Sequence, residues 1–201
     1  SESMARIPSP IKLVRYTSIG TRLRMITDRD NNVKFWDLRL SAFPRFNTGD
    51  WFRFEVTQTH DVVERTFRPS QKHPDIVIPE GTYNFTTFRT GPFPSQSRKL
   101  QPEFVIEVGR YYTGQRYRLM LQNGFRPSSK LSIETDYEIN LLRLPEGNLN
   151  MHVLSNRLIY SFSTDFYVKL FAQWNNDSEL ASVNFLVNYR FKPGSDIYLV
   201  Y

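Results

Sequence analysis

The segment LSIETDYEINLL, residues Leu131–Leu142, decides the fold class because its polar and apolar residues alternate. A two-residue period is typical of a β-strand that has one polar and one apolar face. The polar face carries three successive carboxylates, whereas the opposite face is mostly aliphatic. The apolar face would consist of Leu131, Ile133, Tyr137, Ile139 and Leu141, and the polar face of Ser132, Glu134, Asp136, Glu138 and Asn140.

The same alternation continues along the rest of the chain. It recurs in KFWDLRLSAF (34–43), WFRFEVTQTH (51–60), RYRLMLQNGF (116–125) and DFYVKLFAQW (165–174). No long stretch keeps a helical period, and NTGD, PSSK and LPEGN have the composition of turns. These patterns predict an all-β chain of about eleven antiparallel strands. Each strand would be about nine to twelve residues long, where globular strands average about five or six.

The composition excludes several kinds of protein and site. The 201 residues contain no cysteine, which excludes a disulfide framework and thiolate metal sites. The net charge is +6, but the 26 Lys and Arg residues are spread along the strands without a basic block. This spread argues against a nucleic-acid partner. No run of about eighteen apolar residues is present, so the sequence predicts no transmembrane helix.

Long alternating strands occur in two architectures that turn their faces in opposite directions. A soluble sandwich or barrel turns the apolar face inward, whereas a membrane barrel turns it toward lipid and the charged face toward the lumen. The length of the strands favours the membrane barrel. So do the connections, because tight ones such as FNTGD alternate with longer ones such as RPSQKHPDIVIPEG. The long connection GPFPSQSRKLQP is an exception to this alternation. Aromatic residues also gather near strand ends, as an interfacial girdle requires. They are Trp36, Phe43, Trp51, Phe52, Tyr111, Tyr112, Phe162, Phe166 and Trp174.

We therefore expect an antiparallel up-and-down transmembrane β-barrel over residues 11–201, with residues 1–10 as an N-terminal extension or expression remnant. The final segment, VNFLVNYRFKPGSDIYLVY, predicts a strand, a turn at Pro193-Gly194, and a last strand at Ile197–Tyr201 that pairs back on NFLVNYRF. Lipid does not tolerate unpaired strand edges. We therefore expect the free side of Ile197–Tyr201, and that of a first strand near Arg22–Ile26, to pair with a strand outside this numbering or from a second chain.

From about Ile78 onward the chain resembles the C-terminal β-barrel domain of an uncharacterised family of Gram-negative outer-membrane proteins. The matching stretches are IPEGTYNFTTFR, GRYYTGQRYRLMLQNGFRPSSKLSIETDYE, LPEGNLNMHVLSNRLIYSFSTDFYVKLFAQWNN and NFLVNYRFKPGSDIYLVY. In that family the barrel usually follows a module that resembles family 9 carbohydrate-binding modules. The resemblance implies a Gram-negative outer-membrane location, outer-membrane lipid as a partner, and a link to glycans. Because family members continue with a loop and one last strand, it also implies the C-terminal part of a larger barrel.

The residues that could carry chemistry have plainer interpretations. His152 lies near Ser155, as a catalytic pair would, but alternation places the two on opposite faces of one strand. His60 with Asp61 and Glu64 lacks the spacing of a known metal site. We therefore expect no catalytic, cofactor-binding or metal-binding residue, and no enzymatic activity.

The polar strand faces instead predict a charged lumen wall. Arg116 and Arg118 would form cross-strand ion pairs with the carboxylates of the following strand. Such a wall either fills the lumen or selects polar solutes. The expected lumen-lining residues are Arg116, Arg118, Glu134, Asp136, Glu138, Lys169 and Arg190.

Three functions remain open at this stage. The first is a non-catalytic outer-membrane barrel, a pore or an anchor, with glycan binding or uptake implied by the resemblance. The second is a soluble all-β module that binds carbohydrate or lipid, and the third is a barrel-embedded lipid hydrolase. A membrane barrel needs detergent and is heat-modifiable on a gel, which separates the first from the second. The first also predicts that an arginine at Ile139 hinders insertion more than one at Glu138.

Overall fold

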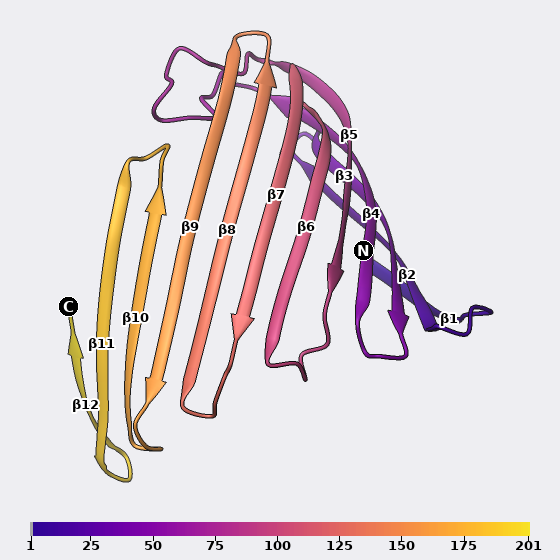
Figure 1. Cartoon of the computed structure of the whole chain (residues 1–201). Helices are drawn as coiled ribbons and strands as arrows, with labels where there is room; N and C mark the ends of the chain where they lie inside the picture. Colours follow the sequence, from indigo (N-terminus) through magenta and orange to yellow (C-terminus); the bar gives the residue numbers. More distant parts are fainter. Residues whose placement is uncertain (1) are drawn as a thin grey trace.

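The computed structural model describes residues 2–201 and contains twelve β-strands in one antiparallel sheet (Figure 1). Consecutive strands are neighbours from β1 to β12, so the chain is an up-and-down meander, which confirms the predicted all-β class. No helix that could span a bilayer is present among these residues. The strands are β1 (Glu2–Pro8), β2 (Val14–Thr27), β3 (Val33–Phe46), β4 (Trp51–Val63), β5 (Gly81–Phe93), β6 (Leu100–Tyr111), β7 (Gly114–Phe125), β8 (Leu131–Leu144), β9 (Gly147–Ser161), β10 (Phe166–Asn175), β11 (Leu180–Lys192) and β12 (Ser195–Val200).

Residues 1–10, which the sequence predicted to be an N-terminal extension, contain the strand β1. Within residues 1–10, β1 pairs with β2 from Glu2↔Arg22 to Pro8↔Tyr16, so the count is twelve rather than about eleven. The segment ESMARIP mixes polar and apolar residues on both faces, so the two-residue period gives no signal there. The first strand is therefore β1, and the expected first strand near Arg22–Ile26 is the second half of β2.

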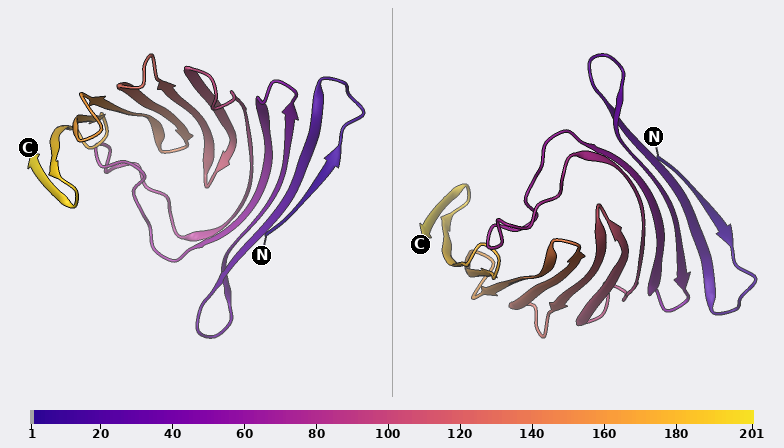
Figure 2. Two further views of the ribbon diagram at one scale, coloured as in Figure 1. Left: turned by 90° about the horizontal axis from the view of Figure 1, so that it is seen from below. Right: turned by 90° about the horizontal axis from the view of Figure 1, so that it is seen from above.

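The sheet curls into an arc that has an inner and an outer face (Figure 2). The connection between β4 and β5, residues 64–80, folds back over the inner side of this arc (Figure 2). Its Ile76 and Ile78 pack on Leu142 and Leu144 of β8, which identifies the inner face of that strand. Strand pleating then assigns the other residues, because side chains that are paired in register share a face.

The 64–80 connection, hereafter the inner strap, forms a buried apolar cluster with β8 and β9. Ile76 and Ile78 are buried with Leu142, Leu144 and Leu149, and aromatic rings of neighbouring strand ends pack around them. Phe67 and Ile78 of the strap pair through two backbone hydrogen bonds. The rings that pack against this cluster are Phe67, Tyr83, Tyr111 and Tyr112.

Connection lengths follow the expected alternation only at one place. The inner strap is long, but the other connections at the same end of the sheet, residues 28–32, 112–113, 145–146 and 176–179, are short. The expected long loop NNDSELAS shrinks to residues 176–179 because β10 and β11 pair as far as Asn175↔Leu180. The exceptional GPFPSQSRKLQP likewise shortens to residues 94–99.

The two edges of the sheet are β1 and β12. As predicted, β12 pairs with β11 through the Pro193-Gly194 turn, and Phe185 and Tyr201 exchange two backbone hydrogen bonds. Among residues 2–201 no register pairing joins β1 to β12 (Figure 1). The expectation that outside strands pair with these two edges remains a prediction.

Candidate functional site on the inner face

A row of alternating charges crosses the inner face along the strand register. Glu55 of β4 is opposite Arg89 of β5, which is opposite Glu107 of β6, which is opposite Arg118 of β7. Each charge thus faces an opposite charge on the next strand, the arrangement that stabilises cross-strand pairs. The sequence prediction did not include Glu55, Arg89 or Glu107. Because their strands alternate, these three residues could have been found by taking every second residue from one known to face inward.

The half of this face on β6–β9 is closely paired. Arg118 donates two hydrogen bonds, both 2.7 Å, to the carboxylate of Glu138, and the Arg157 guanidinium donates one of 2.9 Å to Glu134. Arg116 makes a close ion pair with Glu107. The predicted cross-strand pairing with β8 is confirmed for Arg118 but wrong for Arg116. The β8 residues opposite and diagonal to Arg116 are Asn140, Leu142 and Leu144, none of them a carboxylate, whereas Glu107 of β6 is diagonal to it.

The other predicted lumen residues have different surroundings. Asp136 shares the inner face of β8 with Glu134 and Glu138 and is exposed. Lys169 lies between Ile159 and Leu186 in register, on the same face of β10 as Gln173. Arg190 contacts Asp165 at 4.0 Å and Asp196 at 3.3 Å, next to the turns that precede β10 and β12. Arg190 therefore belongs to the rim of the sheet rather than to the central wall.

The half of the inner face on β3–β5 has more arginines than carboxylates. The Glu55 side chain is only 7% exposed, and the nitrogens of Arg39, Arg53 and Arg89 lie 3.9–4.0 Å from its oxygens. These distances are too long for hydrogen bonds, and the Nε atoms of all three arginines are buried without a hydrogen-bond partner in the structure. One carboxylate is thus shared by three guanidinium groups.

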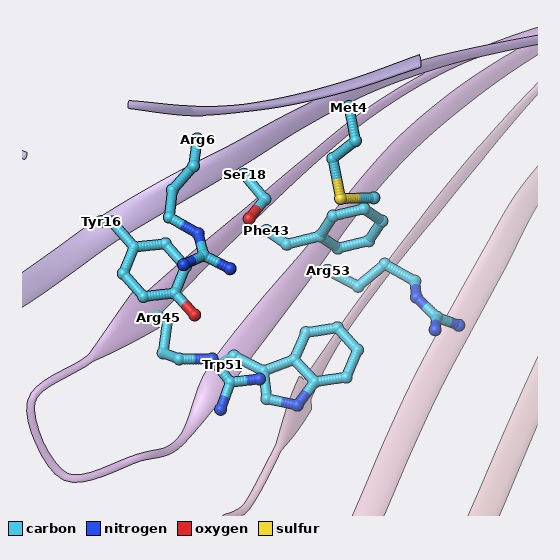
Figure 3. A pocket seen from close by; sticks show the side chains of 8 residues that line it. All are labelled: Met4, Arg6, Tyr16, Ser18, Phe43, Arg45, Trp51 and Arg53. Atoms are coloured by element: carbon cyan, nitrogen blue, oxygen red, sulfur yellow. The ribbon is translucent and has the colours of Figure 1, made fainter. Parts of the chain in front are cut away.

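A pocket of about 290 Å³ continues this basic half toward β1 (Figure 3). Arg6, Arg45 and Arg53 line it together with aromatic side chains, and no carboxylate is part of its lining. Arg6 lies over the ring of Tyr16 at 4.4 Å, and Arg53 lies over the ring of Phe93 at 4.5 Å. Guanidinium groups stacked on aromatic faces are held in one orientation.

The outer face is apolar and exposed. One row of side chains is continuous in register across six strands from β3 to β8, and several members of that row are 40–51% exposed. Parallel rows add Leu23 and Leu38 on one side, and Leu119 and Ile139 on the other. The row consists of Leu40, Val56, Phe88, Val108, Tyr117 and Leu141.

The predicted aromatic girdle is present only in part. Near one end of the outer face, the rings of Tyr160, Phe162, Phe166 and Tyr189 form a chain of contacts, with centroids 4.7–6.0 Å apart. Toward the other end, Trp36 stacks on His60, with centroids 5.9 Å apart, and Trp174 is exposed. By contrast, four predicted girdle residues lie on or against the inner face: three have inner residues as register partners, and Tyr112 packs against the inner apolar cluster. They are Phe43, Trp51, Tyr111 and Tyr112.

His152 and His60 are each hydrogen-bonded to a side chain of a neighbouring strand. His152 is hydrogen-bonded through Nδ1 to the Tyr137 hydroxyl at 2.9 Å on the outer face, whereas Ser155 lines an inner pocket, which confirms their predicted separation. His60 is hydrogen-bonded to the Asn84 side chain at 2.9 Å. In the described part of the chain no cluster of His, Asp and Glu has the composition of a metal site.

The inner strap is docked at its far end on the turn between β10 and β11. The Ser70 hydroxyl donates a short hydrogen bond to Asp177, the Gln71 backbone N–H donates one of 3.0 Å, and Lys72 pairs with Glu179 at 2.8 Å. Burial raises the pKa of Asp177, but the hydrogen bonds from Ser70 and the strap backbone outweigh it and lower the pKa below its ordinary 3.8. Docking is therefore stabilised above pH 3.8 and weakens as the pH falls through the lowered value.

Replacement of Asp177 by alanine should release the strap at neutral pH. The change leaves the Ser70 hydroxyl and the Gln71 N–H without an acceptor, which should cost about 1–3 kcal/mol of docking free energy. Cleavage by trypsin after Lys72 should then be about tenfold faster or more, since it follows the population of the open strap. Asp75→Ala is the matched control, because Asp75 is an exposed strap residue that makes none of these contacts. Equal cleavage rates in the two variants would contradict the docking role.

Comparisons with family models, with curated proteins and with solved structures find no match to this chain. The inner wall, the pocket and the strap are therefore interpreted from their own geometry and charge.

Proposed function

We propose that this chain forms the wall of an outer-membrane β-barrel that surrounds a polar lumen and performs no catalysis. The observation that carries the proposal is the segregation of the two faces: exposed aliphatic and aromatic side chains outside, and arginine–carboxylate pairs inside. A transmembrane barrel requires this distribution. A soluble fold would have to cover the same apolar face, since monomeric soluble proteins rarely expose so large a patch.

The lengths of the strands support the same proposal. β2 to β11 contain between 10 and 15 residues each, whereas a tilted strand needs about nine to eleven to cross a bilayer. The outer aromatic rings near both strand ends are at positions suited to the two interfaces. Because the backbone groups on the free sides of β1 and β12 would need partners in lipid, we further propose that strands from outside these residues pair with both edges.

Whether the barrel acts as a pore or as an anchor depends on how far its lumen is filled. The inner strap crosses the inner side of the arc at one end and is anchored on the opposite part of the sheet (Figure 2). A strap in this position would narrow the lumen, but it adds no strand to the barrel wall. Glycan binding or uptake is part of the proposal only because of the family resemblance. The alternative function is a soluble all-β module that binds carbohydrate or lipid.

Site-directed labelling tests which face contacts lipid. Because the chain has no cysteine, Leu40→Cys and Ser41→Cys each provide a unique site for a fluorescent label, on neighbouring residues of opposite faces. In proteoliposomes, the label at Leu40 should be quenched by brominated lipid and protected from aqueous iodide. The label at Ser41 should show the opposite behaviour. Equal iodide quenching at both positions, or a protein that remains soluble without detergent, would favour the soluble alternative.

A further inference from the structure

The basic half of the inner face has the composition of a binding site for an oxyanion. Around the pocket in Figure 3, Arg6 and Arg45 form no ion pair within the described chain, and Arg53 shares Glu55 with two other arginines. Arg45 donates one long hydrogen bond of 3.5 Å to the Gly49 carbonyl. The closest of the Glu55 contacts is 3.9 Å, so this carboxylate leaves most of the guanidinium donors unused. Excess positive charge with unused donors favours a bound anion.

The aromatic rings determine how these donors are presented. Tyr16 holds the guanidinium plane of Arg6, while Phe93, itself stacked on Trp51 with centroids 4.0 Å apart, holds that of Arg53. A guanidinium whose face is covered by a ring keeps its in-plane N–H edge available. Such an edge fits the two oxygens of a carboxylate, sulfate or phosphate group, and no similar acceptor is present in the pocket lining.

Burial adds a second argument. The Nε atom of Arg53 is buried and has no hydrogen-bond partner in the structure, and Arg39 and Arg89 beside it share this condition. Buried donors without partners are rare in folded proteins, because each carries a desolvation cost. On the paired half, Arg118 donates two hydrogen bonds to Glu138 and Arg116 makes a close ion pair with Glu107, although the Nε atom of Arg116 is also buried without a partner. The basic half differs in that three such arginines share one carboxylate at 3.9–4.0 Å.

We infer that the pocket bounded by Arg6, Arg45 and Arg53 binds the oxyanion group of a small anionic solute. Its volume of about 290 Å³ is at the lower end of ligand pockets, which limits the occupant to a compact molecule. The inference deepens the proposed function and rests on it for the route by which a solute reaches the inner face. In a barrel, the site would enrich anions along one wall, and the paired wall on β6–β9 would not compete for them.

Calorimetric titration of the full chain folded in detergent tests the site directly. The probes are sulfate as a bare oxyanion, glucuronate as a carboxylate on a sugar ring, and glucose as a neutral sugar, at one ionic strength set with chloride. Sulfate and glucuronate should both bind and glucose should not. If only glucuronate binds, the ring contributes to recognition, and if only sulfate binds, the site accepts bare oxyanions. Binding of glucose equal to that of glucuronate would overturn the inference.

Substitutions locate the site and separate it from general electrostatics. Arg53→Gln and Arg45→Gln should each weaken anion binding by about tenfold, since each removes a charge-assisted pair of donors. Arg157→Gln, which removes an equal charge from the paired half, should change it less than about twofold. Arg45→Lys keeps the charge but loses the planar fork, so its loss should be intermediate. Equal losses in Arg45→Gln and Arg157→Gln would overturn the inference.

The two proposals fail in different ways. Lipid quenching at Leu40 concerns only the outer face, whereas anion titration in detergent concerns only the inner face. A chain that binds sulfate but shows no lipid contact would retain the anion site and lose the barrel function. A chain that inserts in lipid but binds neither anion would retain the barrel and lose the site.

Discussion

Replacement of Ile139 by arginine is expected to reduce the stability of the membrane-inserted protein by about 2–4 kcal/mol. Ile139 lies near the middle of β8 on the outer face, where Leu119 of β7 is its register neighbour. An arginine there would place a guanidinium in hydrocarbon, far from the inner carboxylates. The cost should be measured by urea titration of the heat-modifiable, folded band after refolding into lipid vesicles.

The control for this prediction has to be chosen from the structure rather than from alternation alone. The sequence suggested Glu138→Arg as the milder change, but Glu138 accepts two hydrogen bonds from Arg118, so that variant would create a repulsive pair. Asp136→Arg is better matched, since Asp136 is an exposed inner residue of the same strand outside these ion pairs. Its cost should be below about 1 kcal/mol. If both variants unfold at the same urea concentration, the outer face is not in contact with lipid.

The two-residue period predicted the strands and their faces because it depends on local geometry alone. For Leu131–Leu142, the pleat determines which side chains share a face, and the register between β7 and β8 follows from the short connection between them. The same reasoning missed β1, where both faces of ESMARIP are mixed and only pairing with β2 makes a strand. Pairing with β2 therefore makes this segment a strand, which its sequence period did not predict.

Ion-pair partners were less predictable than faces. Arg116 and Arg118 are two residues apart on the same side of β7, yet one pairs with β6 and the other with β8. The choice depends on which neighbouring strand places a carboxylate within reach, and this requires the register of three strands at once. The inward position of Trp51 also depends on register. β4 begins with two aromatic residues, Trp51 and Phe52, on opposite faces, and only pairing with Arg45 and Phe93 shows that Trp51 is the inner one.

The inner strap was visible in the sequence only as a long connection. Its two isoleucines, Ile76 and Ile78, are separated by one residue and read as a fragment of a strand. What determines the position of the strap is a distant surface: the buried Leu142 and Leu149, together with the carboxylate of Asp177 about a hundred residues later in the chain. No local pattern contains that information.

Replacement of Gly91 by alanine is expected to destabilise the fold by about 3 kcal/mol, because the backbones of β5 and β6 meet there. A Cβ atom at Gly91 would overlap the carbonyl oxygen of Phe104 and lie only 2.9 Å from the Val105 Cα. These are backbone atoms, so relief requires one strand to move. β5 and β6 are paired from Thr87↔Gly109 to Thr90↔Ile106, directly before Gly91, so moving either strand would disrupt these pairings.

Gly124→Ala provides the comparison, since the nearest atom to its added Cβ would be the flexible Gln101 side chain at 3.4 Å. This variant should unfold within about 1 kcal/mol of the parent chain in the same urea titration. Gly91 is also opposite Arg53 in register and two residues after Arg89, so a shift of β5 would move both arginines relative to Glu55. Gly91→Ala should therefore lower sulfate binding even where the protein still folds, whereas Gly124→Ala should not. Parent-like stability and binding in Gly91→Ala would show that the close approach of β5 and β6 does not shape the inner wall.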